Sequence, residues 1–191
     1  MSQYAERMPP IATEHLDPAQ RTAAAELIAG PRKAVTGPFV ALLRSPELMR
    51  RVQKLGEFLR FETVLSPAIS EFATLIVARR LTQQFEWLTH VPLALREGVR
   101  PETVDALRDG RRPEDLSEEE ALVYDFAGEL LAHHGVCDAT FKACQNRLGD
   151  RGIVELVGLL GYFVLVSMVL NVAHAPAPAA DAIEPLPWLP R

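Results

Sequence analysis

The chain is poor in cysteine, and its two cysteines are not spaced as a redox pair. Cys137 and Cys144 are the only ones among 191 residues, and they lie seven positions apart instead of the three of a C-x-x-C motif. On one helix, two turns would separate them. We therefore expect reduced thiols in a cytoplasmic protein.

An excess of positive charge is also missing. The chain has 20 Lys and Arg residues against 25 Asp and Glu residues, which gives a formal net charge of −5. Binding nucleic acid requires clustered basic residues that neutralise phosphates, and this chain has only short arginine pairs. We expect no nucleic-acid partner.

The sequence shows no secretory signal, because its first twenty residues contain no apolar stretch of the kind that such signals need. Residues 153–173 are apolar and long enough to suggest a membrane span. However, Glu155 lies near the start of this run, Asn171 near its end, and basic anchors are absent after it. These features favour a buried helix of a water-soluble protein, with no membrane partner.

Alternation of strand type is absent as well, whereas proline is frequent and stands where helices begin. We predict an all-α protein with three parts: an N-terminal arm (1–17), a single helical domain (18–174) and an extended Pro-rich C-terminal arm (175–191) that packs through Trp188. Predicted helices cover 18–29, 46–60, 66–81, 83–98 with a bend at Pro92, 101–108, 117–133, 139–148 and 150–174. The Thr36-Gly37-Pro38 stretch is predicted to be a turn.

Three residues that can move protons near neutral pH lie close together in the sequence: Glu71, Glu86 and His90. Glu86 and His90 are four apart, so on one helix they share a face. A carboxylate beside an imidazole can orient the ring and raise its basicity. The alternatives are a weak exposed ion pair and, for Glu71, a structural role near a helix start. Two ligands are too few for a catalytic zinc site, so we expect no metal.

The order Glu71, Gln83, Glu86, His90 resembles the carboxymuconolactone decarboxylase and alkylhydroperoxidase D superfamily. In its peroxidase branch, a Glu is followed at this spacing by C-x-x-C and then by a His. Here Gln83 and Glu86 stand at the two cysteine positions. The phrase IVARRLTQQFEWLTHVPLALREGV is similar to cysteine-free, decarboxylase-type members that carry E-W-x-x-H, and the flanks GPFVALLRSPEL and VELVGLLGYFVLVSMVLNV extend the resemblance over about residues 35–175.

The resemblance implies an all-α fold of the alkylhydroperoxidase D type, assembled as a homo-oligomeric trimer or hexamer. Without an attacking and a resolving thiol, thiol peroxidase chemistry is excluded. What the resemblance leaves is a lyase of aromatic-compound breakdown that decarboxylates a small carboxylated lactone or organic acid without a cofactor. His90 would donate or accept the proton, Glu86 would orient it, and Glu71 would be the second carboxylate.

Substrate contacts are assigned to six further residues. Arg79 or Arg80 would hold an anionic substrate, since a guanidinium pairs with a carboxylate. The remaining candidates are Gln83, Trp87, Phe39 and Tyr162. A tryptophan such as Trp87 more often packs in a core or an interface, and a buried hydrogen-bonded pair with Glu155 is the default for Tyr162. The rival hypothesis for the whole chain is a small-molecule-binding or structural oligomer that keeps the fold without the reaction.

Overall fold

The computed structural model describes residues 5–179 and 182–187, and in that part every regular element is a helix. The prediction of an all-α protein is therefore confirmed. A single 3-10 turn, η1 (Thr13–His15), precedes the first helix. The α-helices are α1 (Pro18–Ala29), α2 (Pro38–Leu42), α3 (Pro46–Phe61), α4 (Pro67–Arg80), α5 (Gln84–Arg96), α6 (Pro101–Arg108), α7 (Glu118–His133) and α8 (Asp138–Ala173).

Local sequence explains where most helices begin. Five of them, α1, α2, α3, α4 and α6, carry proline in the first turn, where its missing N–H has no partner to lose and its fixed φ suits a helix. Asp17 with Gln20 and Ser117 with Glu120 form capping boxes at α1 and α7. The stretch predicted as a turn at 36–38 is instead followed by the short helix α2. Gly37, with φ of 56°, directs the chain into it.

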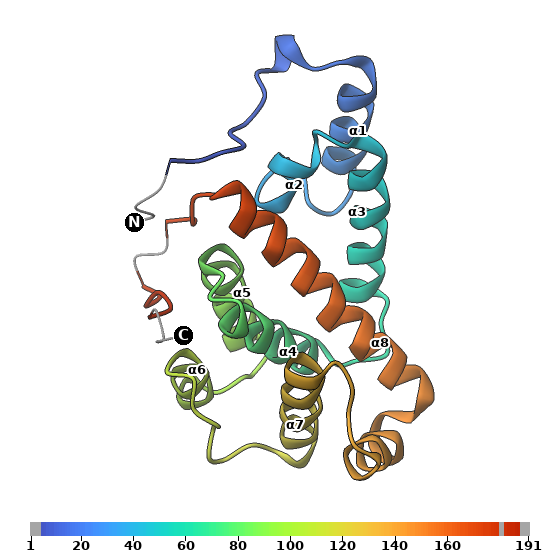
Figure 1. The fold of residues 1–191 in the computed structure, drawn as a ribbon, viewed down its shortest axis with the longest axis vertical. Coiled ribbons are helices and arrows are strands. Elements are labelled where there is room, and N and C mark those ends of the chain that lie inside the picture. Colours follow the sequence, from blue (N-terminus) through green and yellow to red (C-terminus); the bar gives the residue numbers. More distant parts are fainter. Residues whose placement is uncertain (1–4, 180–181, 188–191) are drawn as a thin grey trace.

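Helix α8 runs across the middle of the molecule, with α1, α2 and α3 on one side and α4 to α7 on the other (Figure 1). Its backbone leaves helical geometry at Gly149 (φ 68°, ψ 174°). The two predicted helices, 139–148 and 150–174, therefore meet there in one kinked element. By length and composition α8 could cross a membrane, but 56% of its most apolar 18-residue window is buried in the protein. This burial favours the interpretation as a core helix.

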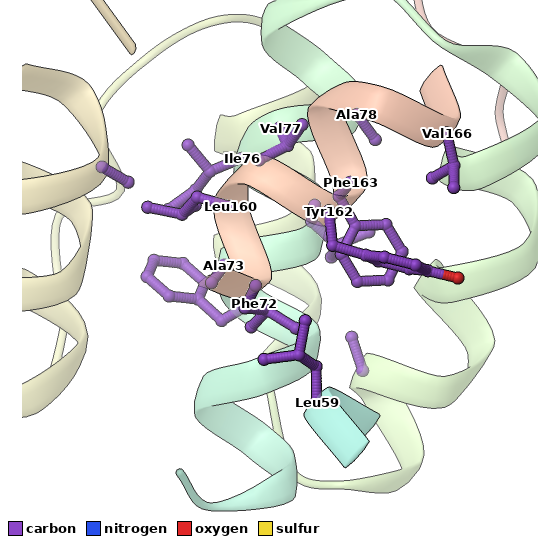
Figure 2. Close-up of a cluster of buried hydrophobic side chains, with 14 of the residues drawn as sticks. Leu59, Phe72, Ala73, Ile76, Val77, Ala78, Leu160, Tyr162, Phe163 and Val166 are labelled. Carbon is purple, nitrogen blue, oxygen red and sulfur yellow. The ribbon is translucent and has the colours of Figure 1, made fainter. Parts of the chain in front are cut away.

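The core lies mainly between α4 and α8, as Figure 2 shows. Phe72, Leu75 and Val77 of α4 and Leu156 of α8 are fully buried. Helix α4 is apolar on nearly every side because α5, α6, α7 and α8 all pack against it. This surrounded helix carries Glu71, so the carboxylate sits on a rigid support.

The described part of the C-terminal arm packs along α4 and α5. Gln84 exchanges hydrogen bonds with Leu186 through both side-chain atoms: its Nε2 donates to the Leu186 carbonyl (2.7 Å) and its Oε1 accepts from the Leu186 N–H (3.0 Å). Arg79 donates to the Pro187 carbonyl at 2.9 Å. Trp188, the expected anchor of this arm, lies outside the described residues.

Candidate functional site: a histidine between two carboxylates

A tight connection between α4 and α5 brings the proton-moving residues together. Thr82 takes a left-handed conformation, with φ of 48°, which turns the chain between the two helices. Gln83 then caps α5, and its Oε1 accepts hydrogen bonds from the N–H groups of Phe85 (2.6 Å) and Glu86 (3.4 Å). The Gln83 amide also donates to Asn171 of α8 at 2.9 Å. Gln83 is thus a buried structural cap that fixes the start of α5.

His90 lies between the two glutamates. Its Nδ1 is 2.6 Å from Glu71 Oε2, and its Nε2 is 3.3 Å from Glu86 Oε2. The edge-to-face contact with Phe163 of α8, at 5.0 Å between ring centroids, holds the imidazole from another side. Glu86 and His90 are only 4% and 3% exposed, so this is not the exposed ion pair considered as an alternative. Of the two carboxylates, Glu71 makes the shorter contact, although the sequence assigned the orienting role to Glu86.

Two carboxylates around one imidazole favour the doubly protonated ring. A neutral imidazole has a single N–H, so one of the facing carboxylates would then meet a lone pair. Burial of the ring opposes its charge and would lower its pKa, but the hydrogen bonds that its N–H groups donate to Glu71 and Glu86, together with the negative charges of these carboxylates, outweigh that effect. The net result is a His90 pKa above its usual value. The ring therefore keeps its proton to a higher pH than an ordinary histidine does.

This arrangement predicts that the protein is more stable in mildly acidic solution. A pKa raised on folding means that protonated His90 stabilises the folded state fully below about pH 6.5, the ordinary histidine value. That contribution disappears as the pH rises through the higher folded pKa. We expect the free energy of unfolding to fall over this window. Urea unfolding of the wild type and of His90→Gln between pH 5 and 9 measures it, and equal pH dependence in both proteins would contradict the assignment.

The polar groups of Arg79 and Trp87 bind the C-terminal arm, and among the described residues no hydrogen bond or ion pair joins Arg80 to this group. The Arg79 guanidinium binds the Pro187 carbonyl, and Arg80 is exposed at the end of α4. Trp87 is 1% exposed, and its indole N–H donates to the Glu184 carbonyl at 3.0 Å. These contacts tie Arg79 and Trp87 to the C-terminal arm, so their assignment to substrate binding is not supported by their surroundings.

Trp87 also lines a cavity of about 290 Å³ between α5, α6 and the C-terminal arm. Its wall on α5 consists of Trp87, Val91 and Leu95. Successive residues of a helix are rotated by about 100° around its axis. The face of α5 that lines the cavity is therefore roughly a third of a turn away from the face that carries Glu86 and His90. None of the three proton-moving residues lines this cavity.

Tyr162 and Phe39 both contact the guanidinium of Arg32, and Tyr162 does not have the partner predicted from the sequence. The predicted Tyr162–Glu155 pair is wrong: Glu155 accepts hydrogen bonds from Thr63 Oγ1 (2.6 Å) and the Val64 N–H (2.7 Å). The Tyr162 hydroxyl instead accepts from Arg32 Nη2 at 3.2 Å. The same guanidinium stacks over the Phe39 ring, 4.6 Å from its centroid.

Arg32 and, beside it, Arg60 were not predicted from the sequence to belong to the site. Arg32 lies in the loop between α1 and α2, and Arg60 in the last turn of α3. The charge of Glu86 acts on Arg32, so this basic group belongs to the surroundings of the proton-moving residues. The only sequence signal was the Gly30-Pro31-Arg32 break, which by itself indicates a loop and no partner.

Neither cysteine contacts His90 or its carboxylates. The Cys137 thiol lies against Glu129 (3.7 Å) and Thr140 (3.3 Å), and the Cys144 thiol against the Leu122 carbonyl (3.6 Å). Burial raises the pKa of the Cys144 thiol, which makes it a poorer nucleophile. Within residues 5–179 and 182–187, no group of three or more His, Cys, Asp or Glu is arranged to hold a metal ion.

Several solved structures have the same fold as this chain. A peroxidase-related protein of Ralstonia eutropha with an alkylhydroperoxidase AhpD core is 16% identical, with a TM-score of 0.73 and coverage of 93% of this chain and 94% of the other. A peroxidase-related protein of Silicibacter sp. is 15% identical, with a TM-score of 0.73 and coverage of 94% and 96%. A protein of unknown function from Agrobacterium tumefaciens, proposed as an AhpD antioxidant defence protein, is 16% identical, with a TM-score of 0.64 and coverage of 72% and 95%.

The chain therefore has the AhpD-like helical fold, as the sequence resemblance predicted. No protein-family model matches the sequence, and no curated protein does so at a significant level. Identities of 15–16% establish the shared architecture only. The activity has to be argued from this chain's own residues.

Proposed function

We propose that the protein is a cofactor-free acid–base enzyme, of the carboxymuconolactone decarboxylase type, that acts on a small carboxylated lactone or related organic acid. The observation that carries the proposal is the His90 imidazole held between Glu71 and Glu86 at 2.6 Å and 3.3 Å. A buried imidazolium with a raised pKa is a suitable proton donor to a carbanion that forms as CO₂ leaves.

The reaction needs only a proton from the protein. The bond between the substrate carbon and its carboxylate breaks, CO₂ departs, and the electron pair stays on carbon as an enolate. His90 Nε2, which makes the longer of the two carboxylate contacts, gives its proton to that carbon. Glu71 keeps the ring oriented through Nδ1 and stabilises its charge, and a proton from solvent restores the imidazolium. The group transferred is a proton, so no thiol or external reductant is required.

The thiol peroxidase alternative lacks its reacting atoms. Gln83 and Glu86 stand at the two cysteine positions of the peroxidase motif that this chain resembles. The chain's own two cysteines contact other residues. The names of the neighbours concern those proteins, which differ from this chain at about five positions in six. We therefore do not extend peroxide reduction to this protein.

A non-catalytic role is the second candidate, and one observation favours it. His90 is 3% exposed and both of its ring nitrogens face carboxylates, as in a purely structural buried network. The distinguishing experiment tests a panel of γ- and β-carboxylated lactones and β-keto acids for release of CO₂. For the lactones, the loss of lactone absorbance measures the same reaction. Wild type and the exposed-site control Glu102→Gln should both turn over at least one compound, and no turnover of the whole panel would support the structural role.

Assembly into a homo-oligomer, a trimer or hexamer, is part of the proposal. Apolar and glycine residues follow one exposed face of α8: Val154, Val157, Gly161, Leu165, Met168 and Val172. A continuous stripe of this kind is typical of a contact surface between subunits. Light scattering coupled to size-exclusion chromatography gives the subunit number directly, and a monomer at micromolar concentration would contradict the expectation.

A further inference from the structure

Two half-buried arginines near the proposed site have no carboxylate partner. The Nε atoms of Arg32 and Arg60 are both buried, and neither makes a hydrogen bond. Among residues 5–179 and 182–187, no ion pair involves either guanidinium. They are also close enough that the charge of Arg60 lowers the pKa of Arg32, after the larger effect of burial. Two unpaired like charges in a partly desolvated place are costly unless an anion binds between them.

The backbone leaves room for these groups at Gly56. A Cβ atom at this position of α3 would lie 2.5 Å from Tyr162 Cζ and 2.7 Å from Arg32 Nη2. Any residue larger than glycine would therefore displace the tyrosine ring or the guanidinium. Gly56 and Arg60 are four apart, so both lie on the face of α3 toward Tyr162. The absence of a side chain at Gly56 lets Tyr162 and Arg32 meet.

Tyr162 contributes a hydrogen-bond donor. Its hydroxyl oxygen accepts from Arg32, and within the described residues its own proton has no acceptor. The residue is 4% exposed. Burial raises the pKa of this phenol, so the proton stays in place at neutral pH. A negatively charged oxygen would accept from this O–H group and also balance the charge of the two guanidinium groups, whose other contacts are with Tyr162 and the rings of Phe39 and Phe61.

This basic group adjoins the proton-moving residues. Tyr162 packs edge-to-face on Phe163 (5.2 Å between centroids), and Phe163 packs in the same way on His90 (5.0 Å). The charge of Glu86 also acts on both Arg32 and Tyr162. A small molecule held by the arginines would therefore lie on the Glu86 side of the imidazole.

We propose that Arg32, Arg60 and Tyr162 form a carboxylate-binding subsite beside Glu86 and His90, which holds the acid group of a small organic acid. This inference rests on the proposed function only for the statement that the bound acid is a substrate. Guanidinium groups bind carboxylates through paired N–H donors, and the Tyr162 hydroxyl adds a third donor. Because the subsite is on the Glu86 side, a second group of the same molecule can reach His90 Nε2.

Binding of benzoate, compared with the uncharged benzamide, tests the subsite without any turnover. Isothermal titration calorimetry of the wild type should give a dissociation constant for benzoate at least about tenfold lower than that for benzamide, because only the anion pairs with the arginines. Arg32→Gln and Arg60→Gln should each weaken benzoate binding about 10- to 100-fold and leave benzamide unchanged. Arg32→Lys should lie in between, since it keeps the charge but loses the paired donors. The exposed Arg21→Gln is the matched control and should bind as wild type.

The outcomes separate this inference from the proposed function. His90→Gln should lose turnover and still bind benzoate, because the arginines remain. Equal affinity for benzoate and benzamide in wild type, or unchanged benzoate binding in folded Arg32→Gln and Arg60→Gln, would overturn the subsite. Should Arg32→Gln not fold, Arg60→Gln decides alone, since Arg60 makes no hydrogen bond or ion pair in the described structure. Tyr162→Phe, which removes only the hydroxyl, should weaken benzoate binding by a few-fold.

Discussion

Replacing His90 by glutamine is expected to lower kcat on any accepted substrate by about 10²- to 10⁴-fold, the usual contribution of a positioned general acid. Glutamine keeps an amide that can bond to one carboxylate, but it cannot release a proton near neutral pH. The fall should appear in kcat more than in KM, because the proton is needed as the carbanion forms. Steady-state kinetics of the lactone found in the panel measures this change.

The same substitution should also destabilise the protein. Without the imidazolium, the carboxylates of Glu71 and Glu86, both largely buried, face each other with no cation between them. Removing one member of a buried charge pair costs about 3–5 kcal/mol. The double variant His90→Gln/Glu86→Gln leaves a single carboxylate, so it should recover part of this stability without recovering turnover. A double variant that is stable and fully active would contradict the role of His90.

Most helix starts and the Glu86–His90 pair were predictable because their signals are local. Proline in the first turn, capping residues and Gly149 each act within one turn of the chain. The Glu86–His90 pair follows from a spacing of four on one helix. Glu71 was added through the resemblance, which did not say which carboxylate partners His90. In the structure, a connection of only three residues, Leu81 to Gln83, joins α4 to α5. A short connection places neighbouring helices side by side.

The basic subsite could not be predicted in this way. Arg32 reaches Tyr162 across 130 positions of sequence, and Arg60 comes from another helix. Nothing in the local pattern of a loop arginine or a helix-end arginine indicates which tertiary partner it meets. The expectation that Arg79 binds substrate rested on the same kind of local signal. Arg79 is near the motif in sequence, but its direction on α4 and the course of the C-terminal arm turn it toward Pro187.

Introducing cysteine at positions 83 and 86, where the chain has Gln and Glu, is expected to give this protein a peroxide-reducing activity that depends on these two thiols. Gln83 is the N-cap of α5 and Glu86 lies in its first turn, where the helix dipole lowers the pKa of a thiol. The chain already places a sulfur at a helix start, because Cys137 caps α8 through its thiol. Residues three apart on a helix are also near enough for a disulfide after modest adjustment.

In the Gln83→Cys/Glu86→Cys variant, an added dithiol supplies the two electrons that reduce the peroxide. One thiolate attacks the peroxide and releases an alcohol, and the other thiol displaces water from the sulfenic acid to form a disulfide, which dithiothreitol reduces. Peroxide consumption should rise at least about tenfold above the wild type and above each single cysteine variant, since two thiols are needed. Adding His90→Gln should then lower it by about 10²-fold, because Glu71 and His90 would serve as the base that activates the thiol. A folded double variant that forms the disulfide but consumes no peroxide would show that Glu71 and His90 do not act as a proton relay, and that result would count equally against their part in decarboxylation.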